Sequence, residues 1–164
     1  MNRNWLYVVL FLILAFTAFY FYHRGSSAPS LQLQNLALKD LNNNAFDQNS
    51  LKGKKTLLCF GASWCGECRK ELQDLMKLHN NELKELQIVV ISDEPLEKIM
   101  AYKEKHNYPF VFLRSEASFS ELGIYSVPTN YLLNKAAKVV KEKTGNFNWE
   151  DASNREHLLT LMDN

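Results

Sequence analysis

Cysteine is scarce in this sequence, and the few cysteines lie close together. The chain of 164 residues has three of them, at positions 59, 65 and 68. A disulfide-stabilised scaffold needs more cysteines, and a structural zinc site needs four ligands, commonly in two separated pairs. The four histidines, at positions 23, 79, 106 and 157, are too scattered to complete such a set. We therefore expect neither a disulfide scaffold nor a metal site.

An excess of charge of either sign is also missing. Lys and Arg together number 19 and Asp and Glu 18, which leaves a net charge of +1 with the two signs intermixed. A nucleic-acid-binding protein needs a basic face, so we expect no nucleic-acid partner. Apolar residues make up 46% of the chain, which is enough to build the core of one domain.

The N-terminal segment contains an uncharged apolar run from Trp5 to Tyr22. Its 18 residues would reach about 27 Å as a helix, close to the roughly 30 Å of a bilayer core. Tyr7 near one end and Tyr20 near the other fit the aromatic belts of a membrane interface. The run predicts one transmembrane helix, with residues 1–24 as an anchor in contact with the lipid bilayer.

A cleaved signal peptide is the alternative to this anchor. Signal peptides have apolar stretches of about 7–15 residues, shorter than this run, and the possible cleavage site before Pro29 is a poor one. The charges of Arg3 and Arg24 are nearly balanced, so orientation is only weakly encoded. We interpret residues 25–30 as a linker and residues 31–164 as the folded domain.

Within the domain, patterns typical of strands alternate with helical patterns. Leucines at two-residue spacings over 31–38 predict a first strand. Further strands are expected at 56–60, 86–91, 110–113, 130–133 and 138–141, and helices at 66–80, 96–106 and 149–162. Units of this β-α-β kind indicate the α/β class, with a sheet that carries helices on both faces.

Cys65 and Cys68 lie where a buried strand leads into a helix. At a helix N-terminus, free N–H groups and the helix dipole stabilise an anion, so the Cys65 thiolate is favoured. Cys68 is one turn further on, close enough to form a disulfide with Cys65. This placement after Trp64 predicts a redox-active disulfide that needs no cofactor.

The segment Phe60-Gly61-Ala62-Ser63-Trp64-Cys65-Gly66-Glu67-Cys68-Arg69-Lys70-Glu71 resembles the active site of the TlpA/ResA-like thioredoxins. The resemblance extends over about 36–145 and includes Val127-Pro128-Thr129, which is similar to the family's cis-proline loop. It implies a thioredoxin-like fold, a mixed central sheet flanked by helices, after the N-terminal transmembrane helix. It also implies that Val127 and Pro128 face the disulfide and bind substrate.

Three further residues have two interpretations each. Glu71 lies on the same helix face as Cys68 and, by the resemblance, handles protons of the active-site thiols; otherwise it complements the helix dipole. Trp64 either faces substrate or covers the core. Cys59 stands where relatives carry Asp or Asn, and we expect it to pack as a small apolar group.

The expected reaction is thiol–disulfide exchange, in which Cys65 forms a mixed disulfide and Cys68 resolves it. The resemblance implies a reductant of extracytoplasmic proteins, for example in cytochrome c maturation. Its partners would be substrate proteins with disulfides or thiols and a membrane electron donor. Its location would be the bacterial cytoplasmic membrane, as a single-pass protein with the domain on the periplasmic side.

Two rival functions remain. A thiol peroxidase of the redoxin group would need a Pro-x-x-x-Thr-x-x-Cys setting, which is missing from the sequence. A copper-binding assembly module would space its cysteines by three residues, whereas here two residues separate Cys65 from Cys68.

Overall fold

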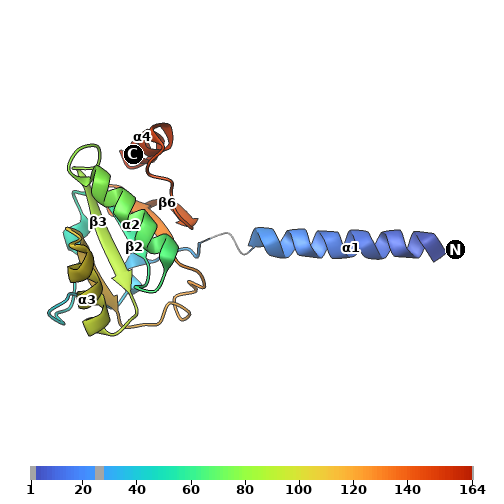
Figure 1. Cartoon of the computed structure of the whole chain (residues 1–164), viewed down its shortest axis with the longest axis horizontal. Coiled ribbons are helices and arrows are strands. Elements are labelled where there is room, and N and C mark those ends of the chain that lie inside the picture. Colours follow the sequence, from blue (N-terminus) through green and yellow to red (C-terminus); the bar gives the residue numbers. More distant parts are fainter. Residues whose placement is uncertain (1–2, 25–27, 164) are drawn as a thin grey trace.

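The structure is a computed structural model that describes residues 3–24 and 28–163. Its described residues form a mixed six-stranded sheet (Figure 1). In spatial order the strands are β1 (Leu38–Lys39), β4 (Val111–Ser115), β3 (Leu86–Ser92), β2 (Lys55–Phe60), β5 (Thr129–Leu133) and β6 (Val139–Thr144). Strands β2, β3 and β4 are parallel, and β1, β5 and β6 pair in antiparallel fashion with their neighbours.

Buried apolar sequence explains the centre of this sheet. The side chains of Leu57, Leu58, Cys59 and Phe60 in β2 are all buried, because the strand lies between two packed layers. Leu57 and Cys59 face one core cluster, and Leu58 and Phe60 face the other. The alternation of side chains along a strand thus divides the core in two.

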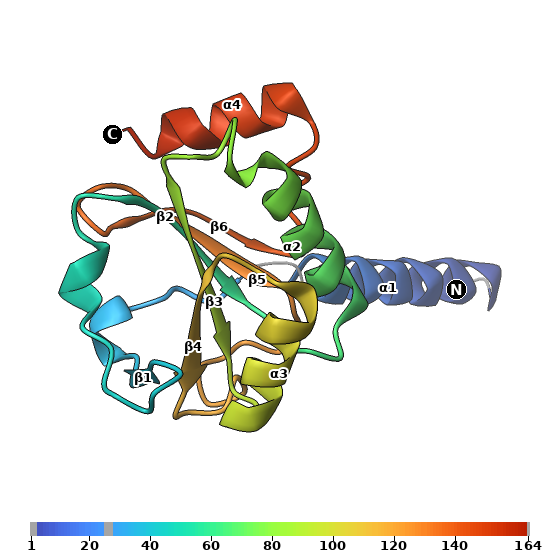
Figure 2. The ribbon, with the colours of Figure 1, turned by 60° about the vertical axis from the view of Figure 1, so that its left-hand side comes forward.

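The helices of the domain all pack on one face of the sheet. These are α2 (Gly66–His79), α3 (Leu96–His106) and α4 (Ala152–Leu161), whose buried residues share one core cluster. Figure 2 shows α4 at the top of the view, near one end of α2. The prediction of helices on both faces is therefore wrong. The chain moves from β2 to β3 to β4 in one direction across the sheet, and right-handed crossovers then put α2 and α3 on the same side.

The opposite face is covered by irregular chain. Short 3₁₀ turns at Leu33–Asn35 and Gln48–Leu51 and the loop 116–128 pack there. The strand expected over 31–38 is confined to β1, because Leu36 N–H bonds to the Leu33 carbonyl and closes a 3₁₀ turn. Leu36 and Leu38 are nevertheless buried, so the apolar spacing reports core contact rather than an extended strand.

The N-terminal segment is helical, as predicted, over α1 (Arg3–Arg24). Figure 1 shows α1 apart from the domain, and its apolar side chains are exposed, for example Phe11 at 70% and Phe16 at 69%. Within residues 3–24 and 28–163, no helix is both long enough and apolar enough to cross a membrane. The predicted transmembrane span is thus not confirmed, and most of the predicted linker 25–30 lies outside the described residues.

The C-terminal helix begins later than expected. Its N-cap is Asp151, whose side chain accepts a hydrogen bond from Asn154 N–H and fixes the start of α4. Trp149 therefore precedes the helix, and its side chain is fully buried against the sheet and α2.

Candidate active site

The Cys65–Cys68 pair lies at the junction of β2 and α2, and the two sulfurs form a disulfide. Cys65 is the N-cap of α2, and its Sγ accepts a hydrogen bond from Cys68 N–H at 3.0 Å. In the reduced protein this N–H and the helix dipole would stabilise a thiolate at Cys65. Cys65 is 6% exposed and Cys68 2%, so Cys65 is the more accessible sulfur, and its role in attacking substrate stays a prediction.

Gly61 gives the disulfide the room it needs. A Cβ atom at this position would lie 3.3 Å from the Cys68 Sγ, closer than ordinary side-chain contacts. The strand also ends here, because Gly61 N–H makes the last bond to the Ile91 carbonyl before the chain turns towards α2. Because Gly61 has no side chain, the Cys68 sulfur can pack directly against the backbone at this position.

The loop before β5 faces the disulfide. The Val127–Pro128 peptide bond is cis, as the resemblance to the TlpA/ResA-like thioredoxins implies. The Val127 carbonyl oxygen lies 3.6 Å from the Cys65 Sγ, a van der Waals contact since a disulfide sulfur carries no hydrogen. Gly145 N–H donates to the Pro128 carbonyl at 2.7 Å and ties this loop to the end of β6. Val127 and Pro128 are thus beside Cys65, and their role in substrate binding stays a prediction.

Two exposed aromatic residues lie close in the chain to Cys65 and Val127. Trp64 directly precedes Cys65 and is 72% exposed, which excludes the interpretation that it covers the core. Tyr125 is 85% exposed and comes two residues before Val127 in the chain. Sequence reasoning missed Tyr125, because a tyrosine in a loop has no pattern that distinguishes recognition from packing.

Glu71 is fully buried on the face of α2 that packs against β5 and the C-terminal segment. Its Oε2 accepts a hydrogen bond from Asn130 Nδ2 at 2.8 Å, and its Oε1 accepts from Phe147 N–H at 3.2 Å and Trp149 Nε1 at 3.0 Å. Burial raises the pKa of Glu71, and these hydrogen bonds with the charge of Lys143 partly oppose that rise. The helix α2 begins at Gly66 and has Glu67 as the acidic residue of its first turn, so Glu71 lies beyond the turn where the dipole acts most strongly. The role of Glu71 in handling thiol protons stays a prediction.

A second carboxylate, missed by sequence reasoning, holds the loop before the cysteines. Glu94 is 9% exposed and accepts hydrogen bonds from Ser63 N–H at 2.6 Å and Ser63 Oγ at 2.8 Å. Ser92 Oγ also donates to it at 3.3 Å. No local signal could have revealed this contact, since Glu94 is 31 residues from Ser63 in the chain.

Cys59 packs in the core, as expected. It is fully buried and outside the disulfide. Burial raises the pKa of the Cys59 thiol well above its ordinary value, and the nearby Glu71 carboxylate raises it further. Cys59 and Cys68 line the same small cavity of about 10 Å³ behind the disulfide, room for about one water molecule.

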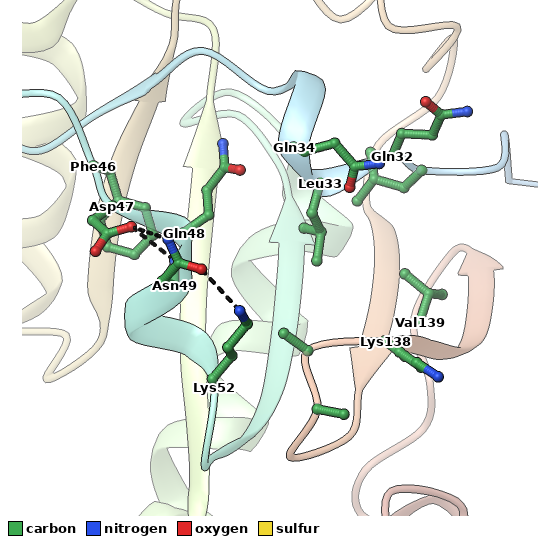
Figure 3. A pocket seen from close by; sticks show the side chains of 13 residues that line it. Gln32, Leu33, Gln34, Phe46, Asp47, Gln48, Asn49, Lys52, Lys138 and Val139 are labelled. Atoms are coloured by element: carbon green, nitrogen blue, oxygen red, sulfur yellow. Dashed lines mark hydrogen bonds between the residues drawn. The ribbon is translucent and has the colours of Figure 1, made fainter.

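The large groove shown in Figure 3 is a different site. It measures about 700 Å³ and lies at the opposite end of the sheet, where β2 begins and the hairpin between β5 and β6 turns. Gln32, Asp47, Lys52 and Lys138 are among its lining residues, and the cysteines are not. The redox chemistry therefore lies outside this groove.

Comparisons with known proteins agree with this geometry. The Redoxin family model matches residues 23–159. The chain is 26% identical over 146 residues to the thioredoxin-like protein YneN of Bacillus subtilis, which covers 82% of this chain and 86% of that protein. It is 26% identical over 155 residues to the thiol-disulfide oxidoreductase ResA of Bacillus thuringiensis, with 88% and 89% covered.

A solved structure is also similar, that of a secreted disulfide oxidoreductase of Mycobacterium tuberculosis homologous to E. coli DsbE. The TM-score is 0.59 at 21% identity, over 78% of this chain and 96% of that one, which confirms the thioredoxin-like fold. The similarity to ResA proteins confirms the resemblance seen in the sequence. With its Cys65–Cys68 disulfide, the protein is a thiol–disulfide oxidoreductase of the ResA kind. The chain belongs to the Redoxin family.

Proposed function

We propose that this protein reduces disulfides of other proteins through the Cys65–Cys68 couple. The observation that carries this proposal is the Cys65 sulfur at the N-terminus of α2, within 3.0 Å of the Cys68 N–H. In the reduced protein, the Cys65 thiolate attacks one sulfur of the substrate disulfide. The substrate S–S bond breaks, one substrate sulfur leaves as a thiolate and takes up a proton, and a mixed disulfide with Cys65 forms.

Cys68 completes the exchange. Its thiol loses a proton and its sulfur attacks the Cys65 Sγ, which breaks the mixed disulfide and releases the second substrate thiol. Two electrons and two protons have then passed to the substrate, and the Cys65–Cys68 disulfide remains. A membrane-bound dithiol donor, our proposed second partner, would reduce it again.

The proposed substrate contacts surround Cys65. An extended substrate segment would lie along the loop at Val127 and Pro128, where backbone groups next to the disulfide are within reach. Trp64 and Tyr125, at 72% and 85% exposure, would contact apolar side chains that flank the substrate cysteine. By the resemblance to ResA-like proteins, disulfides of apocytochromes c are candidate substrates.

The proposed location is the extracytoplasmic side of the bacterial cytoplasmic membrane. Disulfides persist outside the cytoplasm, so a disulfide reductant has substrates there. Membrane attachment is proposed through α1, because residues 5–22 are uncharged and the described side chains of this helix are mostly exposed. The test is cell fractionation of the full chain and of a chain lacking residues 1–24. Equal distribution of the two between membrane and soluble fractions would contradict attachment through α1.

The reaction is tested by trapping. A Cys68→Ala variant cannot resolve the mixed disulfide, so we expect covalent complexes with substrate proteins that disappear on addition of dithiothreitol. The matched control is Cys65→Ala, which keeps Cys68 at 2% exposure and the fully buried Cys59, and should trap nothing. Equal trapping by both variants, or trapping through Cys59, would contradict the proposed roles of the two cysteines.

A further inference from the structure

Trp149 connects the C-terminal segment to the buried carboxylate of the active-site helix. Its side chain is fully buried, and its indole Nε1–H donates to Glu71 Oε1 at 3.0 Å. The same oxygen accepts from Phe147 N–H, and the other oxygen accepts from Asn130 Nδ2 at 2.8 Å. Glu71 thus accepts hydrogen bonds both from the segment before α4, at Phe147 and Trp149, and from Asn130 on β5.

All three of these groups are hydrogen-bond donors. An indole N–H and a backbone N–H cannot accept, and the Asn130 amide is held in its orientation by a second bond from Nδ2 to the Gly145 carbonyl at 3.1 Å. If Glu71 were protonated, its O–H hydrogen would face one of these N–H groups, and neither group could accept a hydrogen bond from the other. The arrangement therefore favours the ionised carboxylate, in opposition to its burial.

The charged and titratable groups around Glu71 come from three elements. Lys143 on β6 is the nearby cation and lowers the pKa of Glu71. Cys59 on β2 interacts with Glu71 electrostatically, and Cys68 lies three residues earlier on α2 and shares a cavity with Cys59. The charge of Glu71 thus acts on the Cys59 thiol, which lines the small cavity behind the disulfide together with Cys68.

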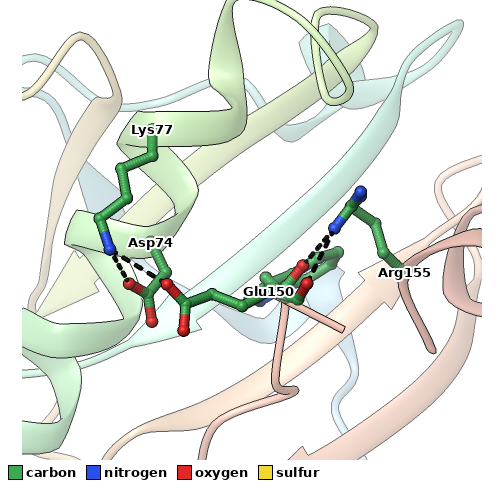
Figure 4. Close-up of polar contacts among 5 residues, drawn as sticks. Asp74, Lys77, Glu150 and Arg155 are labelled. Atoms are coloured by element: carbon green, nitrogen blue, oxygen red, sulfur yellow. Dashed lines mark hydrogen bonds and ion pairs between the residues drawn. The ribbon is translucent and has the colours of Figure 1, made fainter. Parts of the chain in front are cut away.

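Contacts outside the site hold the backbone at Trp149 and the residue after it. Arg155 Nη1 donates to the Trp149 carbonyl at 2.7 Å. Lys77 on α2 pairs with both Asp74 at 2.8 Å and Glu150 at 3.1 Å (Figure 4). The residue after Trp149 is therefore paired with the same helix that carries Glu71.

We propose that Trp149 and Asn130 are positioning residues that hold the Glu71 carboxylate ionised and oriented to accept the proton that Cys68 loses. The proposal rests on the proposed exchange reaction. When Cys68 attacks the mixed disulfide, its proton passes to Glu71, the new Cys65–Cys68 bond forms, and the departing substrate thiolate is protonated by solvent. Glu71 later releases its proton to solvent, so atoms and electrons balance. The C-terminal segment thereby belongs to the proton-handling site.

The test isolates the resolving step in the full chain. Reduced protein is mixed rapidly with oxidised glutathione, and release of glutathione from the Cys65 mixed disulfide is followed from pH 5 to 9 by acid quench and mass spectrometry. Trp149→Phe keeps the aromatic ring and removes the N–H. Loss of one hydrogen bond to a carboxylate should shift the acidic limb of the release rate by about one pH unit upward, roughly a tenfold loss on that limb.

Tyr131→Phe is the matched control. Tyr131 is equally buried, its hydroxyl donates to the Pro29 carbonyl at 2.8 Å, and it packs in the core cluster on the opposite face of the sheet. This variant should lose stability comparably without moving the limb. Asn130→Ala is a second variant that should move the limb in the same direction as Trp149→Phe. In a Glu71→Gln background, Trp149→Phe should have no further effect on the pH profile.

The outcomes separate the inference from the proposed function. If wild-type and Trp149→Phe profiles superimpose, or if Tyr131→Phe shifts the limb equally, the positioning role is refuted while the exchange reaction stands. An unchanged profile in Glu71→Gln refutes it as well, because the carboxylate would then accept no proton. If the wild type forms no mixed disulfide at Cys65, the proposed function itself fails.

Discussion

The contact between Glu94 and Ser63 makes a sharp prediction about the active-site loop. The Glu94 carboxylate is 9% exposed and accepts both the backbone N–H and the hydroxyl of Ser63, at 2.6 and 2.8 Å. Glu94→Ala leaves the Ser63 N–H without its partner in a partly buried position, where an unsatisfied donor costs about 1–3 kcal/mol. Adding the lost hydroxyl bond, we expect the free energy of unfolding to fall by about 3 kcal/mol. Glu94→Gln, which keeps one acceptor, should lose about 1 kcal/mol.

The chain offers a matched control for this prediction. Glu121 accepts the same pair of donors from Ser118, N–H at 2.7 Å and Oγ at 2.8 Å, but in an exposed loop. Water can replace a partner there, so Glu121→Ala should change stability much less. The assay is urea unfolding of the oxidised full chain, followed by circular dichroism of the domain.

A second measurement connects the loop to the chemistry. Ser63 lies two residues before Cys65, so a loosened loop should also expose the cysteine. In the reduced protein, alkylation of Cys65 should be faster in Glu94→Ala than in wild type and unchanged in Glu121→Ala. Equal stability losses for Glu94→Ala and Glu121→Ala, or a loss in Glu94→Ala without faster alkylation, would refute the reasoning that this carboxylate supports the active-site loop.

Four more predictions concern Glu71, Cys59 and Tyr125. Glu71→Gln should lower the apparent pKa of the active-site thiols, seen in thiolate absorbance against pH, because a carboxylate beside them disfavours a second anion. Burial raises the pKa of Glu71 above its ordinary value of 4.5. The contribution of Glu71 to the free energy of unfolding is therefore full below pH 4.5 and is lost as the pH rises through the folded-state pKa. The loss of stability caused by Glu71→Gln should accordingly be larger at acid pH than at neutral pH, as urea unfolding at several pH values would show. Cys59, whose pKa is raised by burial, should resist alkylation in the folded protein at neutral pH, and Cys59→Ala should still yield the Cys65–Cys68 disulfide by mass spectrometry. Tyr125→Ala should slow exchange with protein disulfides and leave exchange with oxidised glutathione unchanged.

Local chemistry made the centre of the site predictable. The Cys65–Cys68 disulfide and its place at the start of α2 follow from a buried strand, a short turn and a helical pattern in adjacent residues. The cis bond before Pro128 follows from the resemblance of a short motif. In each case the residues that determine the geometry are neighbours in the chain, so their spacing carries the information.

Contacts between distant segments could not be predicted in the same way. Trp149 is 78 residues from Glu71 and contacts it only because the segment that precedes α4 folds back onto α2. The apolar spacing at Leu36 and Leu38 indicated burial correctly but not backbone conformation, because a 3₁₀ turn can bury leucines as well as a strand can. Placement of helices on one face depends on strand order, which periodicity does not contain.

The residues around the disulfide are of two kinds: buried carboxylates that hold its surroundings, and exposed aromatic side chains that could contact substrate. Glu94 before the cysteines and Glu71 after them are buried and held by two or more hydrogen bonds each, so the geometry of the disulfide depends on the interior. Trp64 and Tyr125 are mostly exposed, so their substitution disturbs little packing. Changes at the buried carboxylates should therefore alter thiol ionisation and rate with every substrate. Changes at the exposed aromatics should alter which protein substrates are preferred, while the reduction potential of the disulfide stays the same.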